Sequence, residues 1–161
     1  MKNVVILGAG ESGAGAAILA QQLTLSVWVS DAGAIAAKYK NELQERGIAF
    51  EENGHSEEKV MQADLVIKSP GIPEKASIVK KVRAAGIELI SEVEFAFRHK
   101  GSSKVIAITG SNGKSTTTAL TYHICRHAGK SCALVGNIGF SFARQIAEDP
   151  KELYVLEISS F

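Results

Sequence analysis

Two glycine-rich segments could bind phosphate groups, because each follows a short apolar run and opens a helical pattern. In the first, residues 8–13 read Gly-Ala-Gly-Glu-Ser-Gly. A nucleotide-diphosphate site needs a tight turn at Gly8, a close backbone approach at Gly10, and close helix–strand packing at Gly13. Asp31 ends the next apolar run, where dinucleotide sites carry an acid that contacts the ribose. We therefore predict a nucleotide-diphosphate site, with a purely structural glycine turn as the alternative.

The second segment, residues 110–116, reads Gly-Ser-Asn-Gly-Lys-Ser-Thr. It departs from the standard P-loop spacing, because Ile108 stands where the first glycine is required, but it keeps the Gly-Lys-Ser core. Backbone N–H groups of such a loop surround phosphates, Lys114 can reach the phosphate oxygens, and the Ser115 hydroxyl can ligate Mg²⁺. The segment predicts a second phosphate site, and the alternative is a glycine turn with a surface lysine.

Short apolar runs must position these loops, and longer amphipathic stretches separate them. Several runs are continuously apolar, as in parallel strands covered on both faces, and their alternation with helical patterns indicates βαβ units. Ser56, followed by Glu57 and Glu58, is predicted to cap a helix. The predicted strands cover residues 4–7, 26–29, 48–50, 64–68, 87–90, 105–109, 132–135 and 153–158.

A polar, glycine-containing break at residues 100–103 divides these strands into two series. The fold class is α/β: residues 1–99 form a Rossmann-like parallel-sheet domain, and residues 100–161 form the beginning of a P-loop ATPase α/β domain. Because the second series stops directly after a strand, we expect the chain to be the N-terminal part of a longer protein.

Composition excludes several classes of partner. The 161 residues are 45% hydrophobic, which supports a packed core, and the net charge of +1 gives no global basic field for nucleic acid or an anionic membrane. No apolar stretch approaches the ~20 residues of a membrane helix. Two cysteines do not make a disulfide scaffold. We expect a cytoplasmic protein, a monomer, without nucleic-acid or membrane partners.

The second glycine segment resembles the ATP loop of the Mur ligases, the amide-forming ligases of bacterial peptidoglycan synthesis, which share its shortened glycine spacing. Residues 136–139 (Gly-Asn-Ile-Gly) and 156–161 (Leu-Glu-Ile-Ser-Ser-Phe) resemble two further motifs of this family. The variants at residues 69–72 and 91–95, together with the Ser-Ser-Phe ending, most resemble the members that join D-glutamate to UDP-N-acetylmuramoyl-L-alanine. The resemblance spans essentially the whole chain.

The resemblance implies that the first domain binds the UDP part of this substrate rather than NAD. Glu11 can adjoin the diphosphate only if its carboxylate points away from it. Asp31 would contact the uracil, and the whole implied substrate site is Gly10, Glu11, Ser12, Gly13, Asp31, Ser69, Pro70, Gly71 and Asn137.

In the second domain, the resemblance implies ATP and Mg²⁺ as cofactors. Ser115 and Glu157 would serve Mg²⁺, Asn137 would face the muramoyl substrate, and Lys114, Glu157 and Asn137 would form the catalytic set. The ATP phosphates would contact Gly110, Ser111, Asn112, Gly113, Lys114, Ser115 and Thr116.

The implied reaction activates the carboxylate of UDP-N-acetylmuramoyl-L-alanine as an acyl phosphate, which the amine of D-glutamate then attacks. The rest of the family's machinery would lie beyond residue 161, so we expect this chain to bind substrate but to have no ligase activity alone. The alternatives are an NAD-binding dehydrogenase and a regulatory nucleotide-binding domain. The dehydrogenase leaves the second glycine segment and Glu157 unexplained.

Overall fold

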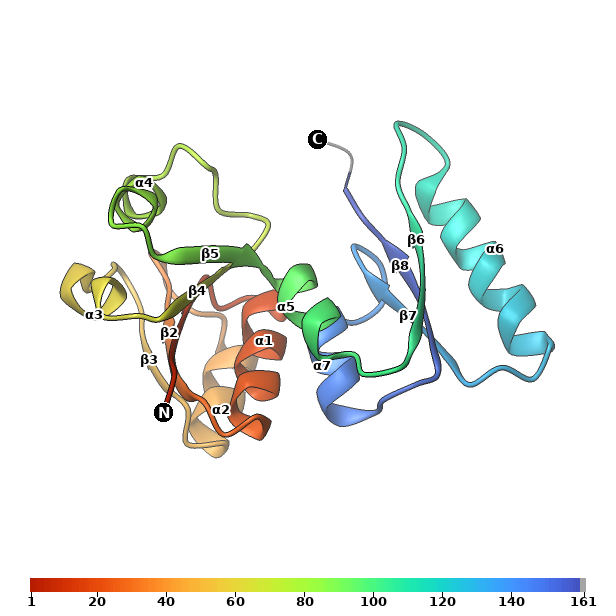
Figure 1. Cartoon of the computed structure of the whole chain (residues 1–161), viewed down its shortest axis with the longest axis horizontal. Helices are drawn as coiled ribbons and strands as arrows, with labels where there is room; N and C mark the ends of the chain where they lie inside the picture. Colours follow the sequence, from red (N-terminus) through yellow and green to blue (C-terminus); the bar gives the residue numbers. More distant parts are fainter. Residues whose placement is uncertain (160–161) are drawn as a thin grey trace.

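The computed structural model describes residues 1–159 and contains two parallel β-sheets with helices around them (Figure 1). The first sheet has the strand order β3-β2-β1-β4-β5, and the second has the order β6-β8-β7. The strands are β1 (Asn3–Leu7), β2 (Ser26–Ser30), β3 (Ala49–Glu51), β4 (Leu65–Lys68), β5 (Glu88–Ser91), β6 (Lys104–Ile108), β7 (Cys132–Gly136) and β8 (Leu153–Glu157). The α/β class is confirmed, and each predicted strand is present.

Seven helices connect these strands in the described part of the chain. They are α1 (Glu11–Gln22), α2 (Ala37–Glu45), α3 (Glu57–Met61), α4 (Ser77–Ala84), α5 (Glu92–His99), α6 (Lys114–His127) and α7 (Phe142–Glu148). None of them has the length and apolarity that a bilayer-crossing segment requires. Ser160 and Phe161, the end of the Ser-Ser-Phe motif, lie outside the described residues.

The continuous apolar run of β1 is explained by its central place in the first sheet. Val4 and Ile6 belong to the core that includes α1 residues, whereas Val5 and Leu7 belong to a second core shared with α3 and α4. Both faces of the strand are therefore buried, and the alternation expected of a half-exposed strand is absent.

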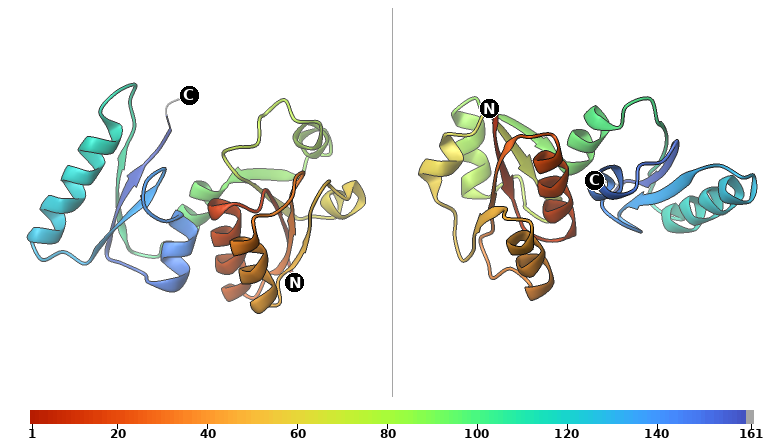
Figure 2. Two further views of the ribbon diagram at one scale, coloured as in Figure 1. Left: turned by 180° about the vertical axis from the view of Figure 1, so that it is seen from behind. Right: turned by 90° about the horizontal axis from the view of Figure 1, so that it is seen from below.

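The first sheet and the helices α1 to α5 form a first unit, and the second sheet with α6 and α7 forms a second unit. Helix α7 lies between the first unit and the second sheet (Figures 1 and 2). On one side, Phe142 packs edge-on against Tyr154 of β8, with ring centroids 4.9 Å apart. On the other side, α7 approaches α1 so closely that a Cβ added at Gly15 would lie 1.9 Å from Ser141 Oγ. Val4 of β1, Phe142 and Tyr154 belong to one continuous hydrophobic core. The two sheets are thus joined through a packed helix as well as through the chain between them.

The predicted cap at Ser56 is wrong in its side-chain contact, although Ser56 does precede α3. Its hydroxyl donates to the Glu51 carboxylate instead of accepting from the helix. Glu51 also accepts from the Ser56 amide at 2.7 Å and from the Ser30 hydroxyl at 2.6 Å. Partial burial would raise the pKa of Glu51, but the hydrogen bonds from Ser30 and Ser56 outweigh it and lower the pKa to about 2. The ionised Glu51 carboxylate is a strong acceptor, and its hydrogen bond orients the Ser56 hydroxyl toward β3.

Glu92, the first residue of α5, places its carboxyl group at the amino terminus of α7. The residue is 3% exposed, and its Oε1 accepts a hydrogen bond of 2.6 Å from the Ala143 amide. Burial raises the pKa of Glu92 to about 7 against the opposing effect of the Ala143 amide, and the nearby Glu11 carboxylate acts in the same direction as burial. This buried acid therefore titrates near neutral pH.

The Glu92→Gln substitution should make the free energy of unfolding less dependent on pH, because glutamine does not ionise. An unfolded glutamate has a pKa near 4.5, whereas folding raises the pKa of Glu92 to about 7. The contribution of protonated Glu92 to stability is fully present below pH 4.5. It is lost as the pH rises to 7, and this loss reduces the free energy of unfolding by about 3 kcal/mol. Denaturant titrations should show that the free energy of unfolding of Glu92→Gln, relative to that of the parent, is higher at pH 8 than at pH 5. The exposed neighbour Glu94, changed to Gln, is the control, and equal pH dependence of parent and Glu92→Gln would contradict the expectation.

Candidate functional site

The first glycine loop has the backbone geometry that its sequence predicts. Gly8 has a φ of +89°, which favours glycine, and a Cβ at this position would lie 2.9 Å from Ser69 Oγ. A Cβ at Gly13 would lie 1.8 Å from the Gly8 carbonyl oxygen, so α1 meets the turn after β1 too closely for any side chain. Ser69 is therefore directly beside this loop, and Pro70 and Gly71, which follow it in the chain, are exposed.

The amino terminus of α1 is open to an anion. Gly10 is the residue before the helix, its backbone is extended, and no atom lies within 4 Å of the position where its Cβ would be. The amides of Glu11, Ser12 and Gly13 begin the helix and have no carbonyl acceptor one turn earlier. Open N–H groups and the positive end of the helix dipole make this turn suitable for a phosphate.

Asp31 holds the first glycine loop in place. Its Oδ2 accepts a 2.7 Å hydrogen bond from the Ala9 amide, and its Oδ1 accepts one of 2.9 Å from the Gly33 amide. Each carboxylate oxygen therefore already has a backbone donor within the described chain. This contact gives Asp31 a structural task at the site, and its predicted contact with the nucleotide base remains a prediction.

The Glu11 carboxylate points away from the open turn and toward α7. Its Oε1 accepts from Arg144 Nε at 2.8 Å and from the Ser141 amide at 3.3 Å. This is the orientation that a neighbouring diphosphate would require, because a carboxylate directed at it would repel it. Any contribution of Glu11 to phosphate binding is left to its backbone amide.

The second glycine loop leads into α6 through a left-handed residue. Gly113 has a φ of +73°, and α6 begins at the next residue. Lys114 folds back over the loop, and its Nζ donates to the Gly110 carbonyl at 2.7 Å and to the Ser111 carbonyl at 3.5 Å. Ser115 and Thr116 occupy the exposed first turn of α6. The loop thus concentrates a cation and open helix amides around one space.

The sheet register brings the other predicted residues of the second unit to this same edge. Glu157, the last residue of β8, pairs with Ile108 at the end of β6 and with Gly136 at the end of β7. Asn137 follows directly, and its Nδ2 donates to Ser159 Oγ at 2.7 Å. Ligands of open α/β sheets bind outside the carboxyl ends of the strands, which is where these residues lie.

Glu157 suits a magnesium ion better than it suits a structural role. It is 4% exposed, and its Oε2 is buried without a hydrogen-bond partner among the described residues. A buried carboxylate oxygen of this kind requires a compensating cation or donor. Mg²⁺ binds through one or two protein oxygens together with waters and phosphate oxygens. The Glu157 carboxylate and the exposed Ser115 hydroxyl fit that donor set.

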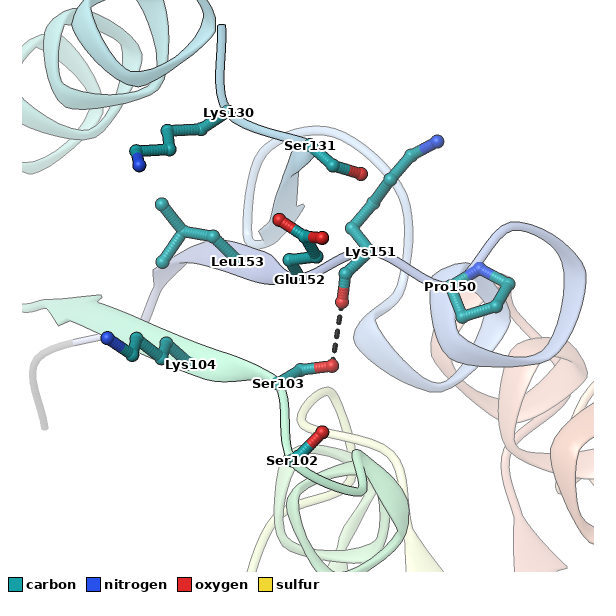
Figure 3. A pocket seen from close by; sticks show the side chains of 9 residues that line it. All are labelled: Ser102, Ser103, Lys104, Lys130, Ser131, Pro150, Lys151, Glu152 and Leu153. Atoms are coloured by element: carbon teal, nitrogen blue, oxygen red, sulfur yellow. Dashed lines mark hydrogen bonds between the residues drawn. The ribbon is translucent and has the colours of Figure 1, made fainter. Parts of the chain in front are cut away.

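A hollow of about 480 Å³ lies at the opposite edge of the second sheet (Figure 3). Lys104 and Leu153, which line it, are the first residues of β6 and β8, whereas both glycine loops follow the last residues of their strands. Ser103 Oγ donates across it to the Lys151 carbonyl at 2.7 Å. The hollow is therefore separate from the predicted phosphate sites.

Comparison with known families accounts for both glycine loops. The N-terminal domain of the MurD-like Mur ligases matches residues 2–91, and the Mur ligase middle domain matches residues 108–161. The chain belongs to the Mur ligase family. The resemblance inferred from the loop motifs is confirmed, and the dehydrogenase alternative, which left the second loop unexplained, is not needed.

Two curated relatives of this Mur ligase chain share one name. It is 56% identical over 161 residues to the UDP-N-acetylmuramoylalanine--D-glutamate ligase of Cytophaga hutchinsonii and 53% identical to that of Bacteroides fragilis. These alignments cover 99% and 100% of the chain but 36% of each relative. The chain therefore spans about a third of the length of the relatives it matches.

Solved structures of other Mur ligases share the fold. A murein peptide ligase from Psychrobacter arcticus matches with a TM-score of 0.63 and 23% identity, over 98% of this chain and 37% of that one. UDP-N-acetylmuramate-alanine ligase MurC from Thermotoga maritima matches with a TM-score of 0.59 and 20% identity, over 99% and 37%. At these identities the likeness supports the arrangement of elements only.

Two residues next to the candidate site were not predicted from the sequence. Arg144, in α7, contacts Glu11 across 133 positions of sequence, and Glu92 contacts α7 across 51. No local motif marks Arg144, and the family-like segment 91–95, which includes Glu92, does not indicate a contact with α7. An arginine or glutamate within an amphipathic helix is ordinarily exposed. The sequence offered one signal for Arg144. A carboxylate at the start of a predicted phosphate-binding helix, Glu11, needs a partner that directs it away from the phosphate.

Proposed function

We propose that this chain is the part of a UDP-N-acetylmuramoyl-L-alanine:D-glutamate ligase that binds the UDP substrate and ATP. The observation that carries the proposal is the presence of two separate glycine-rich helix amino termini, on α1 and α6, which follow the parallel strands β1 of the first sheet and β6 of the second. A dehydrogenase needs one dinucleotide site, whereas a ligase that activates a nucleotide-linked acid needs two. The name shared by relatives above 50% identity supports the same choice.

In this proposal the first unit anchors the substrate. The amides at the start of α1 bind the diphosphate, Gly10 leaves room for it, and Asp31 keeps the loop in its binding conformation. Ser69, Pro70 and Gly71 border the same space. The muramoyl and alanyl groups extend toward the second unit, where Asn137 would face them.

The second unit would carry the chemistry of activation. When bound, ATP supplies the phosphoryl group that converts the substrate's carboxylate into an acyl phosphate, which an amine can attack. Lys114 would leave the loop carbonyls and neutralise charge on the phosphates. Glu157 and Ser115 would hold Mg²⁺ beside them. The amine of D-glutamate would then attack the acyl carbon and displace inorganic phosphate, with loss of a proton from the nitrogen, to form the amide. Because the chain spans about a third of its relatives, we expect substrate binding but no ligation by this chain alone.

We also propose that the protein is a monomer and acts in the cytoplasm. The free thiols of Cys125 and Cys132 are compatible with this location.

Changing Gly10 to Glu should abolish binding of the UDP substrate. The new carboxylate would occupy the open space at the start of α1 and repel the diphosphate, so the affinity should fall at least tenfold, or about 1.4 kcal/mol. Calorimetric titration with UDP-N-acetylmuramoyl-L-alanine measures this. Gln22→Glu adds the same charge at the other end of α1 and should leave the affinity within about twofold. Equal affinities of Gly10→Glu and the parent would contradict the proposed site.

Changing Lys114 to Met should weaken binding of Mg²⁺–ATP about tenfold or more. The substitution keeps the length of the side chain and removes the cation that the phosphates would contact. Fluorescence titration with a labelled ATP analogue, checked with unlabelled ATP, provides the affinity. Lys130→Met, which removes an exposed lysine beside the hollow at the opposite edge of the sheet, is the matched control. If both variants bind equally well, the second loop is not the ATP site.

A further inference from the structure

Arg144 is the centre of an ion cluster between the two units. Its side chain is 10% exposed. Its Nε donates to Glu11 Oε1 at 2.8 Å, and its Nη1 and Nη2 donate to the two oxygens of Glu42 at 2.5 and 2.8 Å. The hydrogen bonds from Arg144 lower the pKa of Glu42, so this carboxylate stays ionised. One buried guanidinium therefore hydrogen-bonds two carboxylates, from α1 and α2, and lies 3.6 Å from a third, that of Glu148 in α7 itself.

The position of Glu11 gives this cluster a consequence for the substrate loop. Glu11 is the first residue of α1, so its backbone amide belongs to the open turn while its carboxylate is a fixed negative charge beside that turn. An uncompensated carboxylate there would repel a diphosphate and compete with it for the helix amides. Arg144 both neutralises this charge and directs it toward α7.

We propose that Arg144 is a positioning residue for the diphosphate site of the first unit, acting through Glu11. It comes from α7, in the second unit, so the second unit contributes to substrate affinity without touching the substrate. This inference rests on the proposed function, because it requires a diphosphate at the start of α1. The contact between α7 and α1 would then serve substrate binding as well as packing.

The packing role of α7 does not depend on Arg144 alone. Phe142 is fully buried against Tyr154, and the Ala143 amide donates to Glu92. Glu148 of α7 also pairs with Arg46 of the first unit at 2.5 Å, and this ion pair does not need its weaker 3.6 Å contact with Arg144. Loss of Arg144 should therefore leave α7 in place and free the Glu11 carboxylate. The two effects of Arg144 can be separated by experiment.

The test is a double-mutant cycle in the present chain, with UDP-N-acetylmuramoyl-L-alanine as the titrated ligand. Arg144→Met should lower the affinity about three- to tenfold, and less so at high salt, where charge repulsion is screened. Glu11→Gln in the Arg144→Met background should restore the affinity to within about twofold of Glu11→Gln alone. A purely structural arginine would not be rescued by this change. Arg46→Met, which removes another cation paired with α7, should leave the affinity within about twofold of the parent.

Thermal unfolding of each variant shows whether it is folded at the titration temperature. If the double variant binds as weakly as Arg144→Met, or if Arg144→Met binds as the parent does, the inference is overturned while the proposed function stands. If the unsubstituted chain does not bind the UDP substrate, both the proposed function and this inference fail.

Discussion

The packing of α7 against α1 is the contact on which the arrangement of both loops depends. α1 begins at the first glycine loop, and α7 follows the Gly-Asn-Ile-Gly segment after β7, so the contact between the helices relates one loop to the edge of the other sheet. The approach is close because Gly15 has no side chain where Ser141 needs space. Phe142 and Tyr154 then continue the core of the first unit into the second sheet.

Polar groups are buried in this contact, and each has a partner that explains its position. Arg144 is compensated by Glu11 and Glu42, and Glu92 binds an amide at the start of α7. Buried ion pairs contribute little net stability, because desolvation of the charges offsets their attraction, but they are specific in geometry. The cluster therefore determines how α7 is oriented more than how strongly it is held. A helix held in one orientation would keep the two candidate phosphate sites at a constant separation, which the proposed function requires.

The sequence predicted the strands and both loops well, for physical reasons that are local. The run Val4 to Leu7 is apolar throughout because both faces of β1 are covered, and Gly8 and Gly13 are fixed by a positive φ and by a 1.8 Å approach. The second loop was identifiable because glycine, lysine and a helix start must occur in that order to surround a phosphate.

Contacts between distant segments could not be predicted in the same way. Arg144 and Glu11 are 133 positions apart, and nothing in either local pattern selects the other. The Ser56 hydroxyl was expected to accept from α3, but the Glu51 carboxylate on a neighbouring strand is the stronger partner. Asp31 was predicted at the nucleotide from its spacing, and the structure adds its hydrogen bond to the Ala9 amide. In each case the tertiary partner, which only the fold brings close, determines what the side chain does.

We propose that the chain holds two different nucleotides in two separate sites at the same time. Calorimetric titration with UDP-N-acetylmuramoyl-L-alanine, in the absence and in the presence of saturating Mg²⁺–ATP, tests it directly, with NADH titrated in parallel. We expect one uridine-substrate site per chain under both conditions and no binding of NADH. Mutual exclusion of the two nucleotides, or binding of NADH in place of the uridine compound, would contradict it.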